Sequence, residues 1–173
     1  KKIDYYYSDF NHPLYIMYSS GTTGKPKCIV HGVGGTLLQH NKEHLLHTNL
    51  KDNDRLFYFT TCGWMMWNWL VSGLSCGATL VLYDGSPFFP NYGILWNLVE
   101  RHKINTFGAS AKYFDSCSKE NFDIIDRYNL DSLNTILSTG SPLSPKSYDF
   151  IYSNIKKNVR LSSISGGTDI ISC

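Results

Sequence analysis

The sequence predicts an α/β fold in which a mostly parallel sheet is flanked by helices. Short apolar runs, rich in aromatic and β-branched residues, alternate along the chain with stretches of helical periodicity. Polar loops rich in glycine, serine and threonine follow several of these runs. The 173 residues are 42% hydrophobic and 17% charged, which is typical of a globular domain.

Two strands and a long helix are expected near the start of the chain. The apolar run LYIMY at residues 14–18 predicts a buried strand that stops at a Ser/Gly/Thr loop. The run CIVH at residues 28–31 predicts a second, shorter strand. Residues 33–47 have helical periodicity, and their predicted apolar face consists of Leu37, Leu38, Leu45 and Leu46.

The alternation of strands and helices continues to the end of the chain. Residues 64–74 predict a buried helix, and residues 94–102 predict an amphipathic helix whose basic C-terminal residues suit the helix dipole. Ser144 followed by Pro145 is typical of the start of another helix. Further strands are expected at residues 55–60, 79–83, 104–109, 133–138 and 159–164.

Composition and charge exclude several classes of partner. A net charge of +2 without a run of like charge gives no basic patch for nucleic acid. No stretch approaches the roughly 18 apolar residues of a membrane span. The five cysteines form no C-x-x-C pair, so free thiols in a reducing compartment are expected rather than disulfides. We therefore expect a cytoplasmic, cytosolic protein.

The stretch YSSGTTGKPK, residues 18–27, is a candidate phosphate-binding loop. Gly21 and Gly24 allow backbone N–H groups to curl around an anion, and neighbouring hydroxyls and Lys27 add donors and charge. The stretch is not a Walker A loop, because only two residues separate its glycines and Pro26 follows Lys25. A flexible turn without a ligand is the alternative interpretation.

Two neighbouring motifs suggest other chemistries. HGVGGTL at residues 31–37 is not a dinucleotide fingerprint, because Leu37 occupies its third glycine position. His40, Glu43 and His44 match H-x-x-E-H, the inverted zinc-protease motif, and His47 extends the row. Such short matches arise by chance, and no later helix presents an obvious third acidic ligand. We therefore expect an ordinary helix with exposed histidines.

Two more polar loops follow predicted strands. They are STGSPLSP at residues 138–145 and SISGGTDI at residues 163–170. Ligands of open α/β sheets bind at the carboxyl ends of the parallel strands. All three loops are therefore expected at this one edge of the sheet.

These three motifs, in this order, resemble the acyl-adenylate-forming ligase superfamily, which includes the acyl-CoA synthetases. YSSGTTGKPK resembles their phosphate loop, STGSPL their adenine and acyl segment, and SGGTDI their threonine–acid segment. Other segments, among them KCIVHGVGGTLLQHNKEH and TTCGWMMWNW, resemble the branch that activates acetoacetate. The resemblance covers about residues 14–173 and is weakest between residues 115 and 131.

The resemblance implies an acid–thiol ligase that joins acetoacetate to coenzyme A through an acyl-adenylate. ATP, Mg²⁺ and coenzyme A are the implied cofactors and co-substrates, and the implied partners are small molecules, with the oligomeric state left open. A ligase for another short or medium-chain acid, such as acetate, is one alternative. A non-catalytic remnant with residual nucleotide binding is another.

The resemblance also implies roles for individual residues. Lys27 and Thr168 would assist catalysis, Thr168 by donating to the α-phosphate, and Asp169 would bind Mg²⁺. Gly140, Ser141 and Pro142 would line the adenine site. The implied phosphate loop comprises Ser19, Ser20, Gly21, Thr22, Thr23, Gly24, Lys25 and Lys27, and the implied substrate pocket comprises Trp64, Met65, Met66, Thr139 and Gly166.

Gly166 and Thr139 are the implied determinants of the substrate. Acetate-activating relatives carry a bulky tryptophan where Gly166 stands, so a glycine is expected to leave room for a longer acid. Thr139 could donate a hydrogen bond to a 3-oxo group, and Gly166→Trp is expected to favour acetate. The alternative interpretation is that residues 64–66 are simply part of the core.

The chain is expected to be a fragment of a longer enzyme. It ends at SGGTDIISC, directly after a predicted strand and a polar loop. Residues 1–173 would be part of the N-terminal AMP-binding domain. The ribose-binding aspartate and the C-terminal domain with its lysine, both implied by the resemblance, lie outside these residues, so the isolated chain is expected to be inactive.

Overall fold

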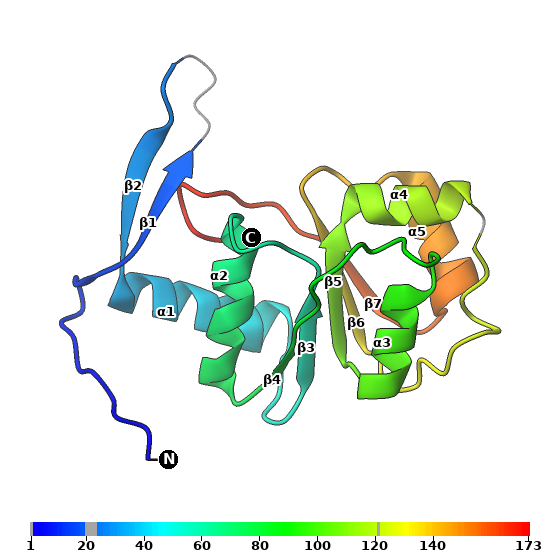
Figure 1. Ribbon diagram of the computed structural model, residues 1–173, viewed down its shortest axis with the longest axis horizontal. Coiled ribbons are helices and arrows are strands. Elements are labelled where there is room, and N and C mark those ends of the chain that lie inside the picture. Colours follow the sequence, from blue (N-terminus) through cyan, green and yellow to red (C-terminus); the bar gives the residue numbers. More distant parts are fainter. Residues whose placement is uncertain (1, 20–23, 121) are drawn as a thin grey trace.

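Five parallel strands form the main sheet of the computed structural model, which describes residues 2–19, 24–120 and 122–173. The strand order is β4-β3-β5-β6-β7, and every adjacent pair runs in the same direction (Figure 1). The predicted α/β class is therefore confirmed. Each strand begins and ends within two residues of its predicted bounds. The strands are β3 (Arg55–Tyr58), β4 (Thr79–Val81), β5 (Thr106–Ser110), β6 (Thr135–Thr139) and β7 (Arg160–Ser163).

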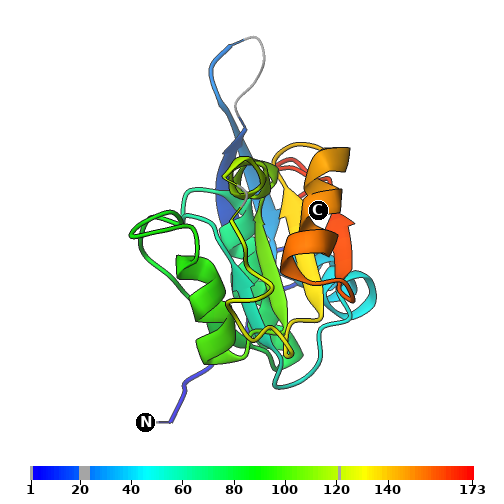
Figure 2. The same ribbon diagram turned by 90° about the vertical axis from the view of Figure 1, so that its right-hand side faces the viewer.

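Helices cover both faces of this sheet (Figures 1 and 2). The predicted helix at residues 94–102 is confirmed with the same ends, and the other predicted helices begin within one residue of their expected starts. No helix in the described residues is long and apolar enough to cross a membrane. The helices are α1 (Val33–Lys42) with η1 (Glu43–His47), α2 (Met65–Ser72) with η2 (Gly73–Cys76), α3 (Ile94–His102), α4 (Ala111–Lys119), and α5 (Pro145–Phe150) with η3 (Ile151–Ile155).

An apolar core fills each face of the sheet, because side chains alternate along every strand. Phe57 of β3 packs into the core beneath α3, α4 and α5, where Phe107 stacks on Trp96 with ring centroids 4.7 Å apart. Leu56 and Tyr58, its neighbours on β3, point the other way, into the core that includes Trp69 of α2. The sheet is thus buried on both sides, as parallel sheets are.

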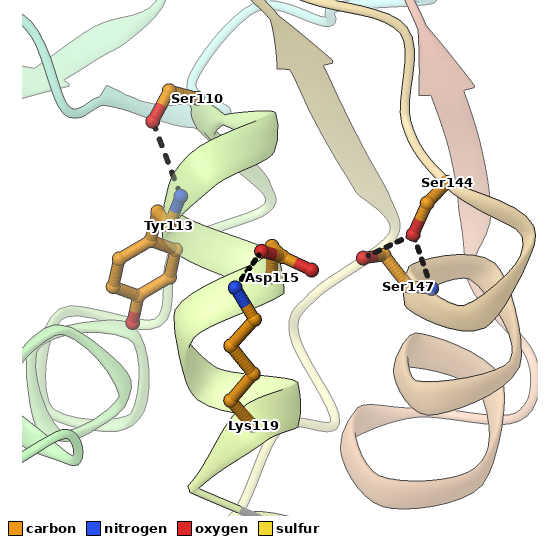
Figure 3. A network of polar contacts seen from close by, with 6 residues as sticks. All are labelled: Ser110, Tyr113, Asp115, Lys119, Ser144 and Ser147. Carbon is orange, nitrogen blue, oxygen red and sulfur yellow. Dashed lines mark hydrogen bonds and ion pairs between the residues drawn. The ribbon is translucent and has the colours of Figure 1, made fainter.

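Serine hydroxyls cap the N-termini of α4 and α5, two of the helices that cover the core around Phe57 (Figure 3). The backbone N–H of Tyr113 donates to Ser110 Oγ at the start of α4 (3.2 Å). The backbone N–H of Ser147 donates to Ser144 Oγ at the start of α5 (3.1 Å), which confirms the predicted Ser144-Pro145 cap. Each bond satisfies a backbone donor that the first turn of a helix leaves free.

The predicted buried strand at residues 14–18 is wrong in its burial and its place. β1 (Pro13–Ser19) pairs antiparallel with β2 (Lys27–Gly32) in a separate hairpin that projects beside the main sheet (Figure 1). Ile16 and Tyr18 are 63% and 68% exposed. A two-stranded ribbon packs only one face in the described structure, so alternate apolar side chains of β1 face outward.

The predicted apolar face of residues 33–47 is also wrong. Its four leucines are exposed, and the buried side of α1 and η1 is polar, with His40, Glu43 and His44 facing α2 and the segment after β7. Two of the three histidines expected at the surface are therefore buried, whereas His47 is exposed. The reason is that hydrogen bonds, rather than apolar contacts, join this helix to its neighbours.

Close packing of β5 on β3 yields the first prediction. A Cβ at Gly108 would overlap the ring of Tyr58, its partner on β3, so Gly108→Ala should destabilise the intact protein by about 1–3 kcal/mol through overpacking. Thermal unfolding measures the effect. Gly35→Ala is the matched control, since Gly35 lies in α1 with no atom near its missing Cβ, and better helix propensity should add about 0.5–1 kcal/mol. An unfolding midpoint for Gly108→Ala at or above that of wild type would contradict this packing.

Candidate functional site

Two cavities lie at the carboxyl ends of the parallel strands, and a third adjoins them beside β1. The segment after β7, drawn in red in Figure 1, leaves this edge and reaches the β1–β2 hairpin. There Thr168 O accepts a hydrogen bond from His31 Nε2 of β2 (2.8 Å). The hairpin, the strand ends and this segment together enclose the candidate site.

The first cavity, of about 170 Å³, gathers all five residues of the predicted substrate pocket. These residues come from the start of α2, the end of β6 and the segment after β7. Sequence reasoning missed four of the other lining residues and had assigned the fifth, Gly140, to the adenine site. The full lining is Tyr58, Phe59, Trp64, Met65, Met66, Ser110, Thr139, Gly140, Gly166 and Cys173.

Only part of the alternative interpretation, in which residues 64–66 belong to the core, holds in the structure. Met66 is buried and packs against Trp69 in the second core, but Trp64 is 62% exposed. Met65 is half-buried and lines the cavity. The start of α2 therefore contributes both to the core and to the wall of the cavity.

The hydroxyl of Thr139 is oriented against its expected role. Thr139 Oγ1 donates its only hydrogen to Ile164 O (2.8 Å), so it presents lone pairs rather than a donor to the cavity. Ser110 Oγ accepts from the backbone N–H of Tyr113 (Figure 3), and its own hydrogen has no acceptor among the described residues. Ser110 is thus the hydroxyl in this cavity that is free to donate. The signal in the sequence that could have identified Ser110 is its position as a serine between a strand and a helix.

Gly166 lines the cavity, but the expectation that it leaves open room is wrong. A Cβ at this position would overlap the backbone of Ser172 and Cys173. A tryptophan there would therefore displace this segment before it filled the cavity, and Gly166→Trp is not a clean test of substrate size. Burial raises the pKa of the Cys173 thiol to about 12, so this cysteine is not poised as a nucleophile.

The second cavity, of about 330 Å³, contains the predicted adenine residues. Gly140, Ser141 and Pro142 line it together with residues 163–166, and it shares Thr139, Gly140 and Gly166 with the first cavity. Gly140 has φ +91°, a left-handed conformation that glycine adopts without strain. The loop after β6 thus turns sharply between the two cavities.

The third cavity, of about 580 Å³, lies between β1 and the start of α2. It shares Trp64 and Met65 with the first cavity, and Thr168 lies in its wall. The predicted phosphate loop forms the tip of the adjacent hairpin: Ser19 and Lys27 are paired at its base, and Gly24 and Lys25 are exposed. Ser20, Gly21, Thr22 and Thr23 lie outside the described residues.

The phosphate loop therefore joins antiparallel strands, and the expectation that it follows a strand of the parallel sheet is wrong. A loop of seven residues is long enough for a hairpin but too short for a parallel crossover. The hairpin nevertheless reaches the same edge, because His31 of β2 holds Thr168.

Asp169 lies in a short turn after β7. Gly167 and Ser172 form an antiparallel bridge, and residues 168–171 turn between them. Asp169 is exposed on this turn. Within residues 2–19, 24–120 and 122–173, no group of three or more His, Cys, Asp or Glu side chains could hold a metal ion.

The H-x-x-E-H motif is used for hydrogen bonding. His40 Nε2 lies 2.6 Å from Ile171 O, and His44 Nε2 lies 2.9 Å from Trp69 O, so each ring donates to a backbone carbonyl. Burial is the main reason that the pKa of both histidines is lowered, for His44 to about 4. Neutral rings suit this environment, because a buried charge without a counter-charge is costly.

Comparison with known proteins decides the family. The profile described as "AMP-binding enzyme" matches residues 7–169. The chain belongs to the AMP-binding enzyme family. Among members of this family, acetoacetyl-coenzyme A synthetase of Rhizobium meliloti (strain 1021) is 60% identical over 164 residues, which are 95% of this chain and 25% of that protein.

Two other relatives of this AMP-binding chain are informative. Malonamoyl-CoA synthetase vrtB of Penicillium aethiopicum is 48% identical over 185 residues, covering 99% of this chain and 26% of that protein. The solved structure of acetoacetyl-CoA synthetase from Streptomyces lividans matches with a TM-score of 0.90 at 44% identity, covering 96% of this chain and 26% of that one. The chain thus spans about a quarter of the length of these relatives.

The buried histidine of η1 yields a prediction about pH. A folded-state pKa near 4, against 6.5 for an ordinary histidine, means that the unfolded chain binds a proton first as the pH falls. Stability should therefore be lost between about pH 6.5 and 4, with His44 contributing up to about 3 kcal/mol.

Thermal unfolding of the intact protein between pH 7.5 and 4.5 measures this loss. His44→Gln, which can still donate to Trp69 O, should flatten the curve. His47→Gln, on the exposed side of the same helical turn, is the matched control. Identical pH curves for wild type and His44→Gln would rule out the assigned role.

Proposed function

We propose that the intact protein carrying this chain is an acid–thiol ligase that converts acetoacetate, ATP and coenzyme A to acetoacetyl-CoA, AMP and pyrophosphate. The observation that carries the proposal is the first cavity, which brings the five predicted pocket residues together beside the candidate adenine cavity. In this proposal residues 1–173 are part of the N-terminal AMP-binding domain, and they are inactive by themselves. The five free thiols support a cytosolic location in this proposal, since disulfides are rare in that compartment.

The names of two relatives narrow the class of acid. An acetoacetyl group and a malonamoyl group both have a carbonyl on the carbon next to the one that bears the activated carboxyl. A small cavity with apolar walls and a hydroxyl donor suits such an acid. We therefore assign a short 3-oxo acid as the substrate, and acetoacetate in particular.

The proposed reaction has two steps. A carboxylate oxygen of the acid attacks the α-phosphorus of ATP, and pyrophosphate leaves. The thiol of coenzyme A then loses its proton and attacks the acyl carbon, and AMP leaves. The hairpin loop would hold the β- and γ-phosphates with backbone N–H groups and the charge of Lys27, and Thr168 would donate to the α-phosphate.

The exposed carboxylate of Asp169 fits a magnesium ion bound together with the nucleotide. Mg²⁺ is commonly held by one or two carboxylates plus substrate phosphates, so a single acidic side chain is sufficient. When bound, the ion supplies positive charge that neutralises the phosphate oxygens. In this assignment Asp169 would hold the metal. Residues 139–142 would line the adenine and acyl cavities.

Acid-dependent exchange of labelled pyrophosphate into ATP tests the function. The intact protein should use acetoacetate with a kcat/KM at least about tenfold above those for acetate and hexanoate, because each methylene gained or lost in a fitted pocket costs about 10–200-fold. Equal use of acetate or hexanoate would favour a ligase for another acid. No exchange with any acid would indicate a remnant that has lost its chemistry.

Ser110 is the residue to which we assign recognition of the 3-oxo group. Ser110→Gly removes the free hydroxyl but keeps most of the helix cap, because glycine caps nearly as well as serine. The ratio of kcat/KM for acetoacetate over butyrate, which lacks the 3-oxo group, should fall about three- to tenfold, the value of one hydrogen bond.

The control for Ser110→Gly is Ser144→Gly, which makes the same change at the cap of α5, outside the three cavities (Figure 3). It should leave the acetoacetate-to-butyrate ratio unchanged. A ratio that stays at the wild-type value in Ser110→Gly would remove Ser110 from the recognition of the acid.

A further inference from the structure

A buried carboxylate outside the three cavities contacts the segment that contains the Thr168–Asp169 turn. Glu43 of η1 is 2% exposed. Its four hydrogen-bond partners are all donors: Gln39 Nε2 (2.7 Å), Trp69 Nε1 (2.9 Å), Cys173 N (3.4 Å) and Ser172 Oγ. No lysine, arginine or histidine forms an ion pair with it among the described residues. These four hydrogen bonds therefore hold the carboxylate in place.

Four side chains of β2, α1 and η1 fix the turn along its length. His31 Nε2 donates to Thr168 O at its start, and His40 Nε2 donates to Ile171 O at its end. Ser172 Oγ then donates to Glu43 and accepts from Gln39 Nε2 (2.6 Å). These contacts join residues more than 125 positions apart in the sequence.

The backbone of the turn needs such support. Ile171 has φ +46°, a left-handed conformation that is a genuine outlier for a β-branched residue. Such a conformation persists only when the surrounding structure fixes it. Ile171 is also buried, and the bond from His40 to its carbonyl lies where the backbone is strained.

This polar arrangement costs free energy, because it buries polar atoms that remain unpaired. His40 Nδ1 and His44 Nδ1 are buried without a hydrogen-bond partner among the described residues. An apolar interface of similar shape would avoid these unpaired atoms. A polar network, unlike apolar packing, fixes distance and direction at each contact, which is what a turn that presents ligand groups requires.

We propose that Glu43 and His40 are positioning residues that hold the Thr168–Asp169 turn in the geometry that binds the α-phosphate and its magnesium ion. The proposal rests on the proposed function and adds to it the residues behind the turn. Neither side chain lines any of the three cavities. His40 acts through the carbonyl of Ile171, and Glu43 acts through the hydroxyl of Ser172. These two residues of the H-x-x-E-H motif thus hold the backbone of the phosphate site in place.

Glu43→Gln in the intact protein tests the proposal with two readouts. The first is hydrogen–deuterium exchange of residues 165–173, where the amides of Gly167, Ile171 and Ser172 close the turn. These backbone amides should exchange about tenfold faster, because the side-chain carboxamide introduced at position 43 has a donor in place of one acceptor oxygen. The second is pyrophosphate exchange, where kcat should fall at least about tenfold and half-saturating Mg²⁺ should rise, with a smaller change in the KM for the acid.

Two further variants make the result interpretable. Asp115→Asn is the matched control, since it makes the same chemical change at an exposed carboxylate paired with Lys119 on α4 (Figure 3), and it should alter neither readout. Ser172→Ala removes only the hydroxyl that joins the turn to Glu43. It should reproduce both effects, and it replaces Glu43→Gln as the test if that variant does not fold.

Each outcome decides between the possibilities. Faster hydrogen–deuterium exchange together with a lower kcat and a higher half-saturating Mg²⁺ concentration supports the positioning role. Unchanged hydrogen–deuterium exchange overturns it, and so does faster hydrogen–deuterium exchange with wild-type kinetics. Glu43 is then a structural residue. If wild type itself forms no acyl-adenylate, the proposed function fails and this inference fails with it, whereas an active wild type matched by both variants overturns the inference alone.

Discussion

The common direction of the five strands is the constraint on which the rest of this structure depends. Because β4, β3, β5, β6 and β7 are all parallel, the segments that leave them begin at one edge. The two apolar cores hold the sheet from both faces and leave this edge as the place for polar loops. The first and second cavities lie at this edge for the same reason, and the third adjoins them because it shares Trp64 and Met65 with the first.

The segment after β7 turns this open edge into an enclosed site. It lines the first cavity through Gly166 and Cys173 and the third through Thr168, while its far side rests on α1 and η1. Residues that line the cavities and residues that are hydrogen-bonded to α1 and η1 are thus interspersed along this segment.

The sequence was sufficient to predict what depends on local pattern. Periodicity located α3 and the parallel strands, and the Ser144-Pro145 pair located α5. The five pocket residues were placed by resemblance and lie around one cavity. Pattern failed where the packing partner decides: the leucines of α1 suggested a core face, but the partners of that helix are a backbone turn and an indole N–H, which select Glu43 and His40 instead.

No sequence pattern shows whether a given hydroxyl donates or accepts a hydrogen bond in the folded protein. Thr139 and Ser110 both carry a hydroxyl at the end of a parallel strand and both line the first cavity. The nearby carbonyl of Ile164 takes the hydrogen of Thr139, whereas the N–H of Tyr113 approaches the lone pair of Ser110 and leaves its hydrogen free. One residue therefore presents an acceptor and the other a donor. A 3-oxo group can only accept a hydrogen bond, so the proposed acid would pair with the hydroxyl of Ser110 and not with that of Thr139.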